Sequence, residues 1–185
     1  VHFLYPSYFP KPSYDFAAEK ITQVKIDLGR LLFFDPILSK DSTISCESCH
    51  SPYNAFAHTD HQLSHGINDS IGLRNAPSLV NLAWHKSFMW DGAINHLDMQ
   101  ALAPITHVGE MGETIQNVLS KMQKTKRYPK LFYQAFGDSV ISSKGLLKAL
   151  AQFQLTLISS NSKYDLVKQG VDSLTSQESN GYQLC

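Results

Sequence analysis

Two cysteines and a histidine stand close enough together to hold a prosthetic group. Residues 46–50 have the sequence Cys-Glu-Ser-Cys-His, which is the C-x-x-C-H spacing of covalent haem attachment. In such a motif the two thiols bond the haem vinyl groups, and the adjacent imidazole becomes the proximal ligand of the iron. The sequence therefore predicts one covalent haem c, held by Cys46, Cys49 and His50.

Two other uses of closely spaced cysteines are open alternatives. A zinc site would need two further Cys or His at finger or ribbon spacing, and the remaining thiol, Cys185, is the last residue. A redox-active C-x-x-C is typical of a βαβ unit, and no strand-like alternation is visible here. Haem is the favoured interpretation, because the region after the motif is long and irregular, as expected of a chain wrapped around a cofactor.

The ligand on the other face of the iron separates an electron carrier from a catalyst. Three histidines in one polar loop after the motif are the nearest in sequence, and a histidine followed by Gly66 suits a ligand that can leave. Spacing alone does not choose among the candidates. These are His58, His61, His65, His85, His96, His107, Met89, Met99 and Met111.

The bulk composition is that of a globular domain. The chain has 185 residues, of which 43% are hydrophobic and 17% charged, with a formal net charge of zero. Nothing in it indicates nucleic acid or an anionic membrane as partner, and the basic residues between 121 and 130 are interpreted as a solvated helix face. The chain contains no run of eighteen apolar residues, so no membrane span is predicted. A start at Val1 without an apolar leader is typical of a processed N-terminus.

Helical periodicity predicts an all-α fold with long loops, and the C-x-x-C-H motif makes it a cytochrome c-like haem domain whose loops wrap the haem. Apolar residues recur at helical spacing over 17–33, 114–126 and 144–159, with a shorter turn over 130–136. We expect an extended arm over 1–16, the haem domain over 17–170, and a linker or helix over 171–185. Thr175 and Glu178 have the form of a capping box, which predicts a helix leading toward a further domain.

Ten short segments follow one another at compatible spacing across roughly residues 25–184. They are Leu28–Asp35, Ser45–His50, Leu63–Gly66, Arg74–Ser78, Trp90–Gly92, Gln100–Ala101, Pro104–Ile105, Glu110–Gly112, Leu150–Phe153 and Asn161–Asp165. Together they resemble the bacterial di-haem cytochrome c peroxidase family, which includes the MauG-type enzymes. Members of that family continue into a second domain with a second haem motif. This chain has one motif, so it resembles the N-terminal half.

The resemblance implies a role for several residues around the haem. Cys46, Cys49 and His50 would hold the low-potential, peroxidatic haem. His65 would be the distal ligand, which must swing away to admit peroxide. Trp90 would lie on the electron path between this haem and the second one; on composition alone it could equally be a core anchor.

The resemblance also places three polar residues. Gln100 and Glu110 would face the opened distal side, and Asn75 would help to bind a Ca²⁺ ion between the two domains. A carboxylate can carry the proton that O–O cleavage requires, and a neutral amide can orient peroxide without adding charge. The simpler interpretations are that Gln100 caps a helix and that Glu110 is an exposed loop carboxylate.

The implied activity is that of a cytochrome c peroxidase. It would reduce hydrogen peroxide to water with electrons from a small c-type cytochrome, in the bacterial periplasm. Members of the family tend to be dimers, so the resemblance also implies a homodimer. One alternative is a mono-haem electron-transfer or sensing domain with fixed His50 and His65 ligation. Another is a MauG-like oxidation of a second protein.

Overall fold

The computed structural model describes residues 2–60 and 62–184, and the regular structure within them is helical. Between the described residues there are three isolated β-bridges and no strand. The predicted all-α fold is confirmed. The helices are α1 (Gln23–Phe34), α2 (Leu97–Gln100), α3 (Leu102–Thr106), α4 (Ile115–Gln123), α5 (Tyr128–Phe136), α6 (Ser143–Leu155), α7 (Lys163–Lys168) and α8 (Ser176–Gln183).

The predicted helices are found, but the first begins later than its pattern suggests. Thr22 is the N-cap of α1, because its side chain accepts from the Lys25 amide at 3.4 Å; the predicted start at residue 17 is wrong. The irregular region predicted over 37–93 contains four short 3-10 turns, at Pro36–Leu38, Pro52–Asn54, Ile67–Asp69 and Leu82–Trp84. The capping box at Thr175 is confirmed as the start of α8.

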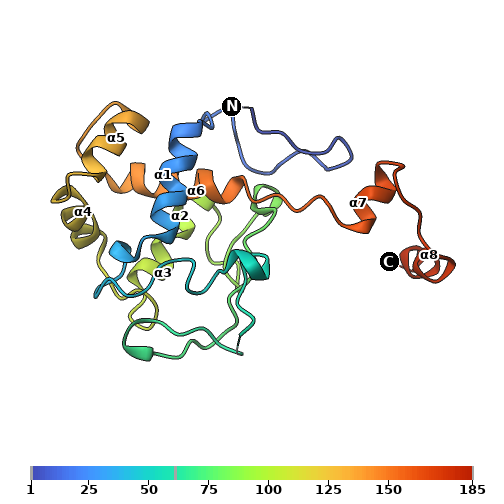
Figure 1. Cartoon of the computed structure of the whole chain (residues 1–185), viewed down its shortest axis with the longest axis horizontal. Coiled ribbons are helices and arrows are strands. Elements are labelled where there is room, and N and C mark those ends of the chain that lie inside the picture. The colour runs from blue at the N-terminus through green and yellow to red at the C-terminus, as the bar shows by residue number, and fades with distance from the viewer. Residues whose placement is uncertain (1, 61, 185) are drawn as a thin grey trace.

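Helices α1 and α6 cross at the centre of the molecule and supply a large part of the core (Figure 1). Leu32 and Phe33 of α1, and Leu146 and Leu150 of α6, are almost completely buried. Gln152 of α6 is buried as well, and its side chain accepts from the Thr22 amide at 3.0 Å and donates to the Lys20 carbonyl at 3.1 Å. A polar group inside the core therefore fixes the point where α1 begins.

Gly29 allows the two central helices to approach at the backbone. A Cβ at this position would lie 1.8 Å from the Ala149 carbonyl oxygen of α6, which is backbone and cannot move aside on its own. We expect Gly29→Ala to lower the free energy of unfolding by about 2–3 kcal/mol, the upper range for overpacking. The measurement is urea denaturation followed by circular dichroism.

Gly181 in α8 is the matched control for this substitution. Nothing lies within 4 Å of a Cβ at Gly181, so Gly181→Ala should leave the urea midpoint unchanged or slightly higher. Equal midpoints for Gly29→Ala and the wild type would contradict the close approach of α1 and α6.

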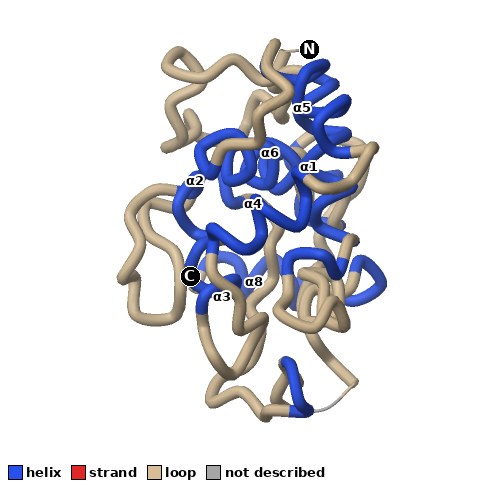
Figure 2. The backbone as a smooth tube through the Cα atoms, turned by 90° about the vertical axis from the view of Figure 1, so that its left-hand side faces the viewer, coloured by secondary structure: helices blue, strands red, loops and turns tan. Residues whose placement is uncertain are grey.

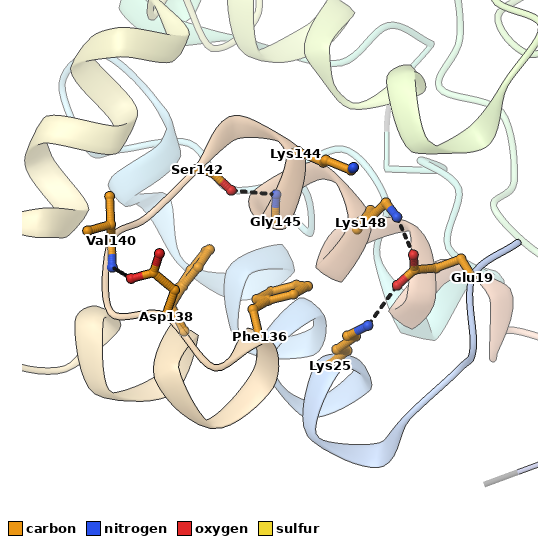
Figure 3. Close-up of a pocket in the computed structure, with 10 residues that line it drawn as sticks. Glu19, Lys25, Phe136, Asp138, Val140, Ser142, Lys144, Gly145 and Lys148 are labelled. Atoms are coloured by element: carbon orange, nitrogen blue, oxygen red, sulfur yellow. Dashed lines mark hydrogen bonds and ion pairs between the residues drawn. The ribbon is translucent and has the colours of Figure 1, made fainter.

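A cavity of about 370 Å³ opens on the far side of this helix pair, away from the haem motif. Figure 3 shows Glu19 between the ammonium groups of Lys25 and Lys148, with Lys144 on the same wall. Burial alone would raise the pKa of the Glu19 carboxyl, but its hydrogen bonds to Lys148 and Lys25 lower that pKa below its usual range. This cluster clamps the segment before α1 onto α6.

Glu19→Gln should therefore reduce stability in a pH-dependent way. A carboxyl whose pKa is lowered on folding stabilises the native state above its unfolded pKa, roughly pH 4, and loses that contribution as the pH falls through the folded value. We expect a loss of about 1–3 kcal/mol at pH 7 that shrinks toward pH 3, measured by urea denaturation at each pH. Lys144→Gln is the control, because Lys144 lines the same cavity without pairing to Glu19; a pH-independent loss for Glu19→Gln would contradict this.

The N-terminal arm before α1 contacts both the helical body and α7. The arm before α1 covers Trp84, whose indole N–H donates to the Pro10 carbonyl at 2.7 Å. Tyr8 of this arm donates to Asp165 of α7 at 2.9 Å, although α7 and α8 project from the body (Figure 1). Loops fill most of the remaining outline in Figure 2. Among the described helices, none has the length and apolar character to cross a membrane.

Candidate haem site

The Cys-x-x-Cys-His motif forms a tight turn that packs against the C-terminal end of α1. The amides of Cys49 and His50 donate to the Cys46 carbonyl at 3.2 and 3.0 Å, and the Glu47 amide donates to the Phe33 carbonyl at 3.3 Å. Cys46 packs against the hydrophobic core. The two thiols and the imidazole are thereby presented from one short, well-anchored segment.

The His50 imidazole is oriented by the carbonyl of Phe56. Its Nδ1 lies 3.0 Å from that oxygen, and because a carbonyl only accepts, Nδ1 must carry the proton. Nε2 is then the nitrogen that can bind a metal, as in most metal-binding histidines. Burial lowers the pKa of His50, the Phe56 and Pro77 carbonyls oppose this, and nearby His58 lowers the pKa further.

An unusual turn brings the Phe56 carbonyl to this position. Ala55 and Phe56 both have left-handed backbones, with φ of 53° and 56°, which disfavour residues that carry a Cβ. The Phe56 ring packs against Phe33 and Phe153, with ring centroids 6.0 and 6.3 Å apart, and so holds the turn in place. Because Phe56 acts through its main chain, no sequence pattern could have revealed it.

The state of the thiols argues against thiolate chemistry. Burial raises the pKa of the Cys46 thiol to about 12, and burial also raises that of Cys49. A reactive dithiol needs a thiol of lowered pKa, which these surroundings do not provide. Over residues 2–60 and 62–184, no three His, Cys, Asp or Glu side chains gather closely enough to hold a metal ion.

The loop that carries His65 lies against the loop that carries Glu110. The Ile67 amide donates to the Glu110 carbonyl at 2.8 Å. A Cβ on Gly66 would lie 2.2 Å from the Gly109 carbonyl oxygen, so only glycine permits this contact. The Cys49 sulfur is 3.9 Å from the His65 carbonyl oxygen, and Glu110 is near enough to raise the Cys49 pKa further. The structure therefore gathers Cys49, His65 and Glu110.

A second group of predicted site residues lies around Met89 and its chain neighbour Trp90. It also includes Gln100 and Asn75. The Gln100 amide donates to the Met89 sulfur at 3.7 Å, and the Trp90 indole donates to the Asn75 carbonyl at 2.7 Å. Trp90 is 61% exposed, which excludes the core-anchor interpretation. It borders a shallow depression of about 380 Å³ together with Leu73, Arg74 and Asn75. Glu110 lies 3.5 Å from the His107 imidazole rather than with this group.

Most of the other candidate ligands have local structural roles. His96 accepts from the Asp98 amide at 3.2 Å and caps α2, while His107 accepts from the Gly109 amide at 3.3 Å. Met111 is buried in the core, and His85 stacks on Phe88. Met99 is about half exposed. His61 lies outside the described residues.

These residues fit a covalent haem. The two thiols are free and adjacent to a histidine whose Nδ1 is already bound to a carbonyl. The buried Ser64 hydroxyl lies near the Cys49 thiol but makes no hydrogen bond of normal geometry, so a buried polar atom next to the motif is left without a partner. A buried group of this kind is expected where a ligand belongs.

An all-α chain with this motif packed against the end of a central helix belongs to the class of c-type haem domains. Comparison with known proteins narrows the class. The profile of the family described as "Di-haem cytochrome c peroxidase" matches residues 23–173. The chain belongs to this family, whose members bind c-type haem, and the resemblance seen in the sequence is confirmed.

Individual relatives cover the chain but exceed it in length. It is 36% identical over 160 residues to the methylamine utilization protein MauG of Methylophilus methylotrophus, covering 86% of this chain and 46% of that protein. It is 34% identical over 165 residues to the cytochrome c551 peroxidase of Nitrosomonas europaea, covering 85% of this chain and 47% of that one. The chain thus spans about half the length of these relatives.

A solved structure agrees over the whole chain. The crystal structure of a MauG-like protein associated with microbial copper homeostasis superposes with a TM-score of 0.88 at 31% identity. It covers 100% of this chain, which corresponds to 54% of the solved one.

Proposed function

We propose that this chain is the peroxidatic haem half of a cytochrome c peroxidase that reduces hydrogen peroxide to water. The observation that carries the proposal is the contact between the loops of His65 and Glu110, directly beside Cys49. A ligand that can leave and a carboxylate that can move a proton are then neighbours of the haem motif. Relatives named cytochrome c peroxidase support the same activity.

Cys46 and Cys49 hold the haem covalently in this proposal, and His50 Nε2 is its proximal ligand. The haem supplies the redox chemistry when bound. His65 Nε2 would be the second protein ligand of the haem, and a movement of its loop would release it. Glu110 then takes the proton from the near oxygen of peroxide and returns it to the far oxygen, while the Gln100 amide orients the substrate.

Trp90 faces the second haem domain in this proposal. Its exposed ring is fixed by the hydrogen bond to Asn75 and borders a depression, as expected of an aromatic side chain that a neighbouring domain covers. Electrons from a small c-type cytochrome would arrive through that domain. Asn75 contributes to the Ca²⁺ site between the domains, the enzyme is a homodimer, and its compartment is the bacterial periplasm.

The test uses the full-length protein with a reduced c-type cytochrome and peroxide, after pre-reduction with calcium present. We expect oxidation of the cytochrome, followed by its visible absorbance. His65→Gly should also react faster with peroxide in the fully oxidised protein, because the distal position is then open. Absence of cytochrome oxidation under these conditions would refute the proposed activity.

Oxidation of another protein is the second candidate, because relatives named MauG match as well as the peroxidases do. A mono-haem electron-transfer or sensing domain is the third. In that case the iron would stay six-coordinate and low-spin after reduction and would not bind cyanide or CO. Spectra of the reduced protein with and without CO separate this candidate from both enzymes.

A further inference from the structure

The turn that follows His65 brings a carboxylate onto its imidazole. Nδ1 of His65 and Oδ1 of Asp69 form a hydrogen bond. The chain reverses through Asn68 and Asp69, which both have left-handed backbones with φ of 54° and 56°. An antiparallel bridge between His65 and Ile71 closes the turn, and the Gly66 amide donates to the Ser70 carbonyl at 2.8 Å. Asp69 thus returns to the histidine through a strained turn.

Stability does not explain this contact. The side chains of His65 and Asp69 are 38% and 84% exposed, and exposed pairs of this kind contribute about 0–1 kcal/mol. Left-handed backbone conformations cost roughly 1–2 kcal/mol for residues with a Cβ, somewhat less for Asn and Asp. The exposed pair therefore adds little to stability, and the Gly66 hydrogen bond and the His65–Ile71 bridge already close the turn without it.

The two candidate axial histidines differ in what holds their Nδ1. His50 is bound to the neutral carbonyl of Phe56, whereas His65 is bound to the carboxylate of Asp69. A carboxylate is the stronger acceptor. A histidine that donates Nδ1–H to a carboxylate has its tautomer fixed and its opposite nitrogen made more basic, which strengthens it as a metal ligand.

We propose that Asp69 is a positioning residue for His65, holding the Nδ1 proton so that Nε2 is presented to the haem iron. This inference rests on the proposed function, in which His65 is the distal ligand. Asp69 favours the closed state, and it sets how readily an incoming ligand displaces His65. The strained turn at Asn68 and Asp69 keeps the carboxylate in reach while the loop is closed.

Asp69→Asn in the full-length holoprotein tests the inference. Asparagine keeps the shape of the side chain and tolerates the left-handed backbone, so the substitution removes only the charge. We expect cyanide to displace His65 about 10-fold more readily in the fully oxidised protein, the effect typical of losing such a partner. The visible spectrum should show a larger high-spin fraction, while the thermal midpoint stays at the wild-type value.

Two control variants separate the possible failures. Asp41→Asn neutralises an exposed loop carboxylate that bonds Thr43 rather than a histidine, so its cyanide affinity should stay close to that of the wild type. His65→Gly should be high-spin in the oxidised state. If His65→Gly leaves the spin state unchanged, the proposed ligation is wrong and the role of Asp69 is overturned with it. If His65→Gly becomes high-spin but Asp69→Asn binds cyanide like the wild type, the inference about Asp69 alone is overturned.

Discussion

Replacing both Cys46 and Cys49 with serine should abolish covalent haem attachment. Serine hydroxyls do not add to the vinyl groups, and the two thiols of the motif are the free cysteines among the described residues. Intact mass spectrometry of protein matured with the haem attachment machinery should show one haem per motif in the wild type. The double variant should have lost the haem of this domain, together with its c-type absorbance.

Single substitutions and Cys185→Ser define the baseline for this experiment. Each single variant, Cys46→Ser or Cys49→Ser, retains one thiol, so a fraction of the chains should carry haem through one bond. Cys185 lies outside the described residues and outside the motif, and Cys185→Ser should keep the full haem complement. Haem retained covalently by the double variant would refute the assignment of the attachment site.

Glu110→Gln should have the largest effect on turnover. In the proposed mechanism the substitution removes the group that would carry the proton between the peroxide oxygens, and general acid–base catalysis by one side chain contributes about 10²–10⁴-fold. The side chain of Glu110 is 41% exposed and lies 3.5 Å from His107, so its loss leaves no buried charge unpaired. We expect kcat of the full-length enzyme for peroxide to fall by that factor while the thermal midpoint changes little.

Glu113 provides a matched carboxylate three residues further on. It is buried, it pairs with Lys121 at 2.9 Å and it accepts from Asn117 at 3.2 Å. Burial alone would raise the pKa of Glu113, but Lys121 and the Thr114 amide lower it below its usual range. Glu113→Gln should therefore reduce stability and leave kcat nearly intact. Wild-type kcat in Glu110→Gln, or equal kcat losses in the two variants, would refute the role of Glu110.

The sequence predicted those parts of the fold that depend on periodicity. Helix α6 repeats apolar residues at helical spacing, and most of its length is buried, so its pattern and its packing agree. The start of α1 is set by two contacts of Thr22, the local one of its side chain with the Lys25 amide and the distant one of its own amide with Gln152. The periodicity of apolar residues reports neither contact, and the second leaves no mark on the local sequence.

The residues of the candidate site also fall into two kinds, those that the sequence reveals and those that only the structure reveals. Cys46, Cys49 and His50 are recognisable because their side chains carry the chemistry at fixed spacing. The residues that orient them are not recognisable, since Phe56 acts through its carbonyl and Asp69 reaches His65 through a left-handed turn. Three roles stay predictions, those of Gln100, Trp90 and Asn75. Each would involve a haem or a second domain, and none of their side-chain contacts in the structure involves either.

Gly66 packs against the backbone of Gly109 and Glu110, so the stabilities of the His65 loop and the Glu110 loop depend on each other. A displacement of the His65 loop would remove the Ile67 amide from the Glu110 carbonyl and the Ile67 side chain from its place beside Gly112. Substitutions on the two loops should therefore not be additive, and double-mutant cycles between them should show a coupling free energy of about 0.5–3 kcal/mol. A substitution tolerated on one loop should therefore depend on which residues the other loop carries.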